Sequence, residues 1–166
     1  MDDRQLVARQ LGREPRAFRR VVRRCPFGLP AVTEQDPYTP AGDPFPTTYY
    51  LTCRHLVAAV SRLEAAGGVS RWSSTATVDS ILAASLAAAT AEQRRIRVQL
   101  AAGRTGNDDG ESLALGIGGS RNPVELKCLH AHVAYALARR GYELGERIVA
   151  ELGDELWPAT CCSVDG

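Results

Sequence analysis

The chain has 166 residues, of which 45% are hydrophobic and 23% are charged, and its formal net charge is +1. This balance is typical of a soluble globular protein with a proper core, and it excludes an intrinsically disordered one. A membrane span is excluded as well, because the longest run of low charge, residues 72–90, is rich in Ser, Thr and Ala and contains Asp79. The first residues lack the basic and apolar regions of a secretory signal, so we expect a cytoplasmic protein.

The first half of the chain predicts a small sheet. Sparse apolar positions followed by Gly12 predict a short helix over residues 3–11. Residues 47–52 are mostly β-branched or aromatic, which predicts the clearest strand of the chain. Shorter strands are predicted over residues 18–25 and 31–33, on either side of a turn rich in proline and glycine. Together these strands predict an antiparallel sheet near the N-terminus.

The second half of the chain predicts helices, because its apolar residues recur every three or four positions. We expect helices over residues 53–66, 77–100, 123–137 and 142–152. A short strand is predicted over residues 112–117, and residues 158–166 form a tail. We therefore predict a single α+β domain over residues 1–166, in which a small N-terminal antiparallel sheet packs against four to five helices.

A cysteine and a histidine share one of the predicted helices. Asn122 is a suitable N-cap and Pro123 a suitable first helical residue, so the helix is expected to begin there. Cys128 and His132, four residues apart, would then lie one turn above each other beside the apolar stripe. A thiol and an imidazole at this spacing can share a metal ion or a proton. The spacing leaves open a second interpretation, a small buried cysteine and a hydrogen-bonded core histidine.

Five cysteines favour a metal or redox site, because structural disulfides are disfavoured in a reducing compartment. Thiolates with one imidazole suit Zn²⁺ or an iron–sulfur cluster. No two cysteines have a CxxC spacing, so the fold would have to assemble the site. Cys53 is expected to be the most reactive, because a helix N-terminus favours a thiolate. The predicted metal ligands are Cys25, Cys53, Cys128, His132 and one tail cysteine, Cys161 or Cys162.

A glycine-rich run before a helix offers a second hypothesis, an enzyme. Such a run can present backbone amides to an anion, here with two basic side chains nearby. The predicted anion-binding residues are Gly118, Gly119, Ser120, Arg121 and Lys127. A Cys–His pair, formed by Cys53 or Cys128 with His132, would then act on a phosphate-bearing or carbonyl substrate. The run matches neither a P-loop nor a Rossmann fingerprint, and a simple tight turn is the alternative.

Opposite charges at the two ends of the chain give a third hypothesis. Residues 1–24 contain eight arginines and three acidic residues, a net charge of +5, whereas residues 143–166 contain six acidic residues and one arginine, a net charge of −5. A non-catalytic protein could bind a protein partner through the basic end. Nucleic acid is not the expected partner, because aromatic residues are not interleaved with the arginines. The alternative is that the ends neutralise each other or are simply solvated.

Short blocks spread over most of the chain carry a resemblance. They cover residues 11–16, 25–28, 44–47, 51–53, 60–64 and 127–132. In these blocks the chain resembles a bacterial family of uncharacterised proteins, domain-of-unknown-function family 501. One residue departs from the pattern, since Arg54 stands where the family leads us to expect proline. The resemblance implies a bacterial cytosolic protein and brings no activity, cofactor or catalytic residue with it.

Overall fold

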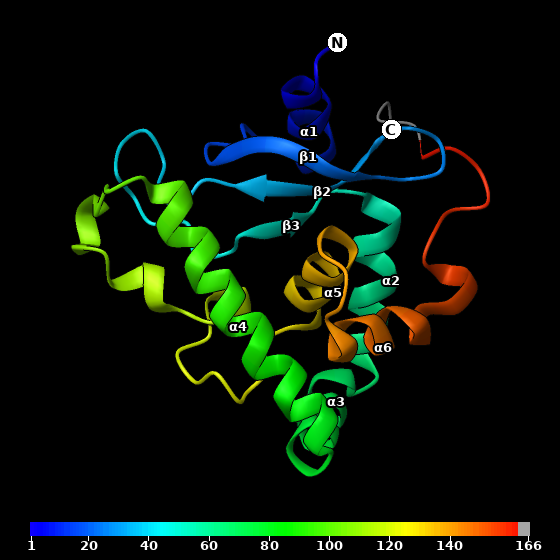
Figure 1. Cartoon of the computed structure of the whole chain (residues 1–166). Helices are drawn as coiled ribbons and strands as arrows, with labels where there is room; N and C mark the ends of the chain where they lie inside the picture. The colour runs from blue at the N-terminus through cyan, green and yellow to red at the C-terminus, as the bar shows by residue number, and fades with distance from the viewer. Residues whose placement is uncertain (163–166) are drawn as a thin grey trace.

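A three-stranded antiparallel sheet and a set of packed helices make up the structure, a computed structural model that describes residues 1–162 (Figure 1). This architecture confirms the predicted α+β fold. Residues 163–166 of the predicted tail lie outside the described residues. The strands are β1 (Phe18–Arg24), β2 (Pro30–Gln35) and β3 (Tyr49–Leu51). The helices are α1 (Asp3–Leu11), α2 (Arg54–Ala65), α3 (Gly68–Val78), α4 (Ser80–Ala101), α5 (Leu129–Ala138) and α6 (Glu143–Leu152).

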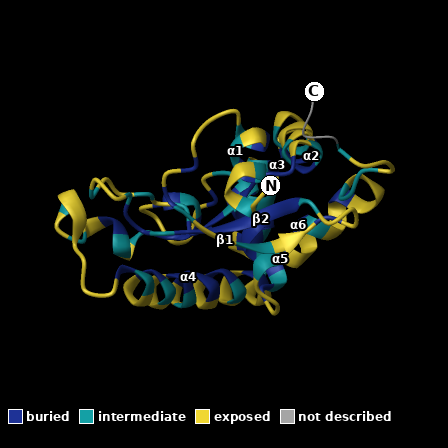
Figure 2. Cartoon of the chain, turned by 90° about the horizontal axis from the view of Figure 1, so that it is seen from above, coloured by how far each residue is buried: buried dark blue, intermediate teal, exposed yellow. Residues whose placement is uncertain are grey.

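The sheet has the order β1-β2-β3, so β2 is its central strand. All six residues of β2 are buried, and the strand is dark blue in Figure 2. In contrast, β1 is an edge strand whose four arginines are exposed while its valines are half-buried. The pairing of β1 with β2 contains several register shifts, whereas β2 and β3 pair in regular register. The chain leaves β3 directly towards α2, which places the start of that helix at the sheet.

Helix α5 lies in the middle of the fold and packs on β3, α2 and α6. Its Leu129 and Val133 side chains are fully buried. The Tyr135 ring stands edge-on to the ring of Tyr49 in β3, with centroids 5.4 Å apart, and to that of Tyr142 next to α6, at 5.5 Å. Such edge-to-face pairs stabilise aromatic packing beyond the area that they bury. Helix α5 is therefore fixed in place from several sides.

The start of α5 differs from the prediction. The helix begins at Leu129, with Cys128 as its N-cap, instead of at Pro123. Asn122 does cap the backbone locally, since its Oδ1 accepts a hydrogen bond from the Val124 amide at 3.2 Å. This hydrogen bond closes a turn and does not start a helix. Asn122 and Pro123 therefore belong to a turn, and the prediction that a helix begins at Pro123 is wrong. The predicted helical flank shared by Cys128 and His132 does not exist, because Cys128 precedes the helix.

Residues 68–101 form two helices where the sequence predicted one. Helix α2 ends before Gly67, as predicted, and Gly67, which has a left-handed backbone with φ +86°, is the N-cap of the unpredicted start of α3. Asp79 then separates α3 from α4, because its carboxylate accepts hydrogen bonds from the Ile81 and Leu82 amides. The described chain thus contains six α-helices, and residues 112–117, predicted as a strand, form parts of two 3₁₀ turns and the short link between them. Among residues 1–162, no helix combines the length and the apolar character needed to cross a membrane.

Candidate functional site

Two helices of the fold begin in the same way. Cys53 is the N-cap of α2 and Cys128 the N-cap of α5, and each is followed two residues later by a histidine, His55 or His130. Neither sulfur makes an ordinary cap hydrogen bond. Burial raises the pKa of both thiols, while the amides at the second and third helical positions act in the opposite direction. The two thiols differ in access, since Cys53 is 3% exposed and Cys128 is only half-buried.

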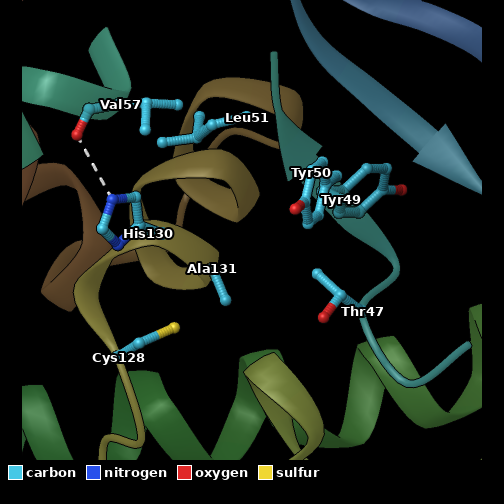
Figure 3. A pocket seen from close by; sticks show the side chains of 8 residues that line it. All are labelled: Thr47, Tyr49, Tyr50, Leu51, Val57, Cys128, His130 and Ala131. Carbon is cyan, nitrogen blue, oxygen red and sulfur yellow. Dashed lines mark hydrogen bonds between the residues drawn. The ribbon is translucent and has the colours of Figure 1, made fainter. Parts of the chain in front are cut away.

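A pocket of about 260 Å³ lies between β3 and the first turn of α5 (Figure 3). Its lining residues are Thr47, Tyr49, Tyr50, Leu51, Val57, Cys128, His130 and Ala131. Figure 3 shows the Cys128 thiol directed towards the side of the pocket where Thr47 lies, and the His130 ring turned towards Val57 of α2. One pocket therefore brings together a thiol, an imidazole and a largely apolar wall.

His130 is held by Glu64 of α2. Its Nδ1 lies 3.1 Å from Glu64 Oε1, and the same oxygen accepts a hydrogen bond from the Leu129 amide at 2.6 Å. A carboxylate can only accept, so Nδ1 carries a proton and donates it. Nε2 lies 3.2 Å from Ser61 Oγ and 3.3 Å from the Val57 carbonyl. It can accept from the Ser61 hydroxyl when neutral and donate to Val57 when protonated, so His130 has partners in both states.

The glycine-rich run approaches this pocket closely. Gly118 has a left-handed backbone with φ +71°, and a Cβ placed there would lie 3.1 Å from Ala131 Cβ and 3.6 Å from Cys128 Sγ. At Gly119, with φ +78°, a Cβ would lie 3.0 Å from Pro46 Cβ. Left-handed conformations and close approaches both require glycine. The sequence allowed either an anion-binding run or a tight turn, and a tight turn accounts for these glycines. The turn lies beside Cys128 and Ala131 of the pocket.

Replacing Gly118 with alanine should lower the free energy of unfolding by about 1–2 kcal/mol, since alanine is strained at positive φ and its methyl group crowds Ala131. Gly110→Ala is the matched control: its φ is +82°, but its nearest neighbouring atom would be 3.8 Å away. Urea unfolding followed by circular dichroism measures both. Equal losses in the two variants would contradict a close approach at Gly118.

The predicted anion-binding residues lie around a second cavity of about 360 Å³. Gly119, Ser120, Arg121 and Lys127 line it, and Gly118 does not. The Arg121 guanidinium already pairs with Glu111 at 2.9 Å. No helix begins at Pro123, so helical amides do not point into this cavity. Lys127 is therefore the positive charge in its wall that has no ion pair among the described residues.

The predicted metal ligands are dispersed. Cys25 is buried at the end of β1, Cys128 faces its pocket, and Cys161 is exposed. Two of the predicted residues do meet, because Cys162 lies beside Cys53. Within residues 1–162, no group of three or more His, Cys, Asp or Glu side chains is arranged to hold a metal ion. Binding of zinc or an iron–sulfur cluster stays a prediction, which metal analysis of protein purified without oxygen would test.

His132 belongs to the core and not to the pocket. Its side chain is 1% exposed, and its Nδ1 lies 2.6 Å from the Tyr142 hydroxyl. The structure therefore places His130, and not His132, in the pocket with Cys128, because the helix starts later than predicted. The repeated Cys-x-His spacing at residues 53–55 and 128–130 was a signal for His130. No comparable pattern in the sequence pointed to Glu64, because this residue belongs to another helix, α2.

The charged ends are largely neutralised by their own neighbours. At the basic end the ion pairs are Arg4–Glu14, Arg19–Asp36, Arg20–Glu34 and Arg24–Asp3. At the acidic end they are Glu143–Arg147, Glu151–Arg71 and Glu155–Arg62. Among the described residues, the two ends also approach each other where the Arg23 guanidinium lies 6.0 Å from the Trp157 ring. A protein partner for the basic end stays a prediction.

A comparison with known families agrees with the resemblance in the sequence. The model of a family described as proteins of unknown function (DUF501) matches residues 21–150, which is most of the chain. The chain belongs to this family. The matched range contains every residue that lines the pocket, together with Glu64 of α2. Searches of curated proteins and of solved structures gave no match. The family brings no activity with it, so a functional assignment depends on the geometry of the site.

Proposed function

We propose that the pocket between β3 and α5 is the active site of an enzyme that acts on a small carbonyl compound, with Cys128 as its nucleophile. One observation carries the proposal: Cys128 and His130 line the same pocket, and Glu64 fixes the His130 ring. Nucleophile, base and orienting carboxylate are the parts that activated cysteines use. The protein would belong to the thiol-dependent enzymes rather than to the metal-dependent ones.

The resting state of Cys128 requires such a base. Burial raises the pKa of the thiol, and the nearby Glu64 carboxylate adds to this effect, while the amides of Ala131 and His130 lower it. The thiol is thus protonated in the free protein at neutral pH. When sulfur adds to a carbonyl carbon, the C=O π bond opens, its electron pair goes to the oxygen, and the S–H proton must leave. His130 lines the same pocket, and we assign it to take this proton on Nε2 once that nitrogen turns from Ser61 to the thiol. The amides then stabilise the negative charge that develops near the helix N-terminus.

The walls of the pocket favour a partly apolar substrate. Tyr49, Leu51, Val57 and Ala131 supply aromatic and aliphatic surface, and Thr47 supplies a hydroxyl. A volume of about 260 Å³ fits a compound smaller than most cofactors.

Alkylation by iodoacetamide tests the nucleophile. Trypsin releases Cys128 in a peptide, residues 128–139, that contains no other cysteine, so mass spectrometry follows its rate directly. We expect His130→Asn to slow the alkylation of Cys128 at about pH 7 by roughly 10- to 100-fold, because the thiol loses its proton acceptor. His55→Asn is the matched control at the same position of the other cysteine-capped helix, and it should leave the rate unchanged.

The substrate class has its own test. Propanal, a small aldehyde, should protect Cys128 from iodoacetamide reversibly in the wild-type protein and less in the His130→Asn variant. The exposed Cys161 serves as the internal control and should not be protected. Alkylation of Cys128 that is indifferent both to His130 and to propanal would overturn the proposal.

A further inference from the structure

We propose that Cys53 and Cys162 form a reversible disulfide when the protein meets a hydroperoxide, and that this bond fastens the C-terminal segment to the start of α2. The inference does not depend on the proposed function of Cys128. It assigns a role to two cysteines that the pocket does not use. It also identifies which tail cysteine is involved, a question that the sequence left open.

The two thiols are neighbours in the folded chain although they are far apart in sequence. Cys162 is close enough to Cys53 to add to the effect of burial in raising the pKa of the Cys53 thiol. Its side chain is half-buried and packs against the hydrophobic core to which Cys53 belongs. Both are free thiols, and Cys161, the next residue, is exposed to solvent. The geometry therefore distinguishes between the two adjacent cysteines and selects Cys162.

Contacts that involve no cysteine hold this segment against α2. The His55 Nε2 lies 2.7 Å from the Glu155 carbonyl, and the Glu155 carboxylate pairs with Arg62 at 3.1 Å. Further along, the Trp157 ring lies beside Arg23 of β1. Figure 1 shows the segment running from the end of α6 back past α2. These contacts hold the segment that leads to Cys162 against the start of α2, and the proposed disulfide requires the two sulfurs to meet there.

The chemistry is balanced with the hydroperoxide as the oxidant. The sulfur of Cys162, the more accessible of the two, attacks one peroxide oxygen; the O–O bond breaks, and Cys162 becomes a sulfenic acid. The Cys53 sulfur then attacks the Cys162 sulfur, the S–O bond breaks, and water leaves. With hydrogen peroxide, two thiols lose two hydrogens and the peroxide is reduced to two waters. A dithiol reductant reverses the change.

The experiment uses the full chain treated with hydrogen peroxide, followed by alkylation of the remaining thiols. We expect a mass loss of two hydrogens that dithiothreitol restores. Trypsin should release residues 25–54 linked to residues 148–166, and fragment ions then separate Cys53 from Cys25 and Cys162 from Cys161. Closing a loop of roughly 100 residues should raise the melting temperature by about 5–10 °C.

Two variants make the outcome decisive. Cys161→Ser should keep both the cross-link and the rise in melting temperature, because Cys161 points to solvent. Cys162→Ser should lose both, and a substitution at this half-exposed position spares the buried Cys53. A cross-link through Cys161 or Cys25, or oxidation of Cys162 without a bond to Cys53, would overturn the inference.

Discussion

Leu129→Ala should lower the free energy of unfolding by about 3–5 kcal/mol, close to the upper end for a truncated leucine. Leu129 is fully buried at the first position of α5. Its Cδ1 reaches so close to Gly68 of α3 that a Cβ there would lie 2.9 Å away. Three helices meet around this side chain, since its own amide donates to Glu64 of α2. The surroundings cannot collapse without moving the helices, so the cavity persists.

Urea unfolding monitored by circular dichroism measures this loss. Ile81→Ala is the matched control, because it also truncates an aliphatic side chain, but Ile81 of α4 is 64% exposed. Its cost should stay below about 0.5 kcal/mol. A loss below about 1 kcal/mol at Leu129 would show that the junction of α2, α3 and α5 is not the rigid centre that the packing indicates.

Acid should destabilise the protein through His132. Burial lowers the pKa of His132 to about 4, well below its ordinary value near 6.5. Between these two values the unfolded chain binds a proton that the folded chain does not, so stability falls as the pH falls through this window. Above about pH 6.5 the contribution is constant, and below about pH 4 the whole of it, about 3 kcal/mol, has been lost.

His132→Gln should remove this dependence. The difference in unfolding free energy between wild type and variant is expected to shrink by about 3 kcal/mol from neutral pH to about pH 4, as measured by urea unfolding at several pH values. Tyr142→Phe is the control: it removes the hydroxyl that lies 2.6 Å from Nδ1 but keeps His132 buried, so the pH dependence should remain. Parallel acid profiles of the wild type and the His132 variant would contradict the prediction.

Much of the fold follows from local patterns. The β-branched and aromatic residues 47–52 predicted β3, and the apolar spacing before Gly12 predicted α1, whose cap is that glycine. The start of α5 could not be predicted in this way. Its first amide is satisfied by Glu64, 65 residues earlier in the chain, so Leu129 can begin a helix without a local oxygen cap. A contact between distant residues decided the boundary, while Asn122 and Pro123 gave only the local preference.

The candidate site likewise depends on contacts between distant residues, which local sequence patterns do not predict. Cys128 could be named as a candidate from its neighbouring histidines, although the sequence equally allowed a small buried cysteine. The choice between His130 and His132 depended on the helix start, which was wrong. No pattern in the sequence relates Cys162 to Cys53, because the fold places them near each other only through the path of the tail past α2. Periodicity predicts which face of a helix is buried, but not what packs against it.

The position of β1 at the edge of the sheet points to a different role for the arginines of the basic N-terminal region. An edge strand exposes unpaired amide and carbonyl groups, onto which the strand of another molecule can add and begin aggregation. β1 carries four exposed arginines, and its pairing with β2 is interrupted by register shifts. A second copy of β1 laid alongside would meet an irregular edge lined with charged side chains. Exposed arginines and an irregular edge both hinder the pairing of one molecule's strand with another's, and this protection against self-association is sufficient reason for four arginines in an edge strand.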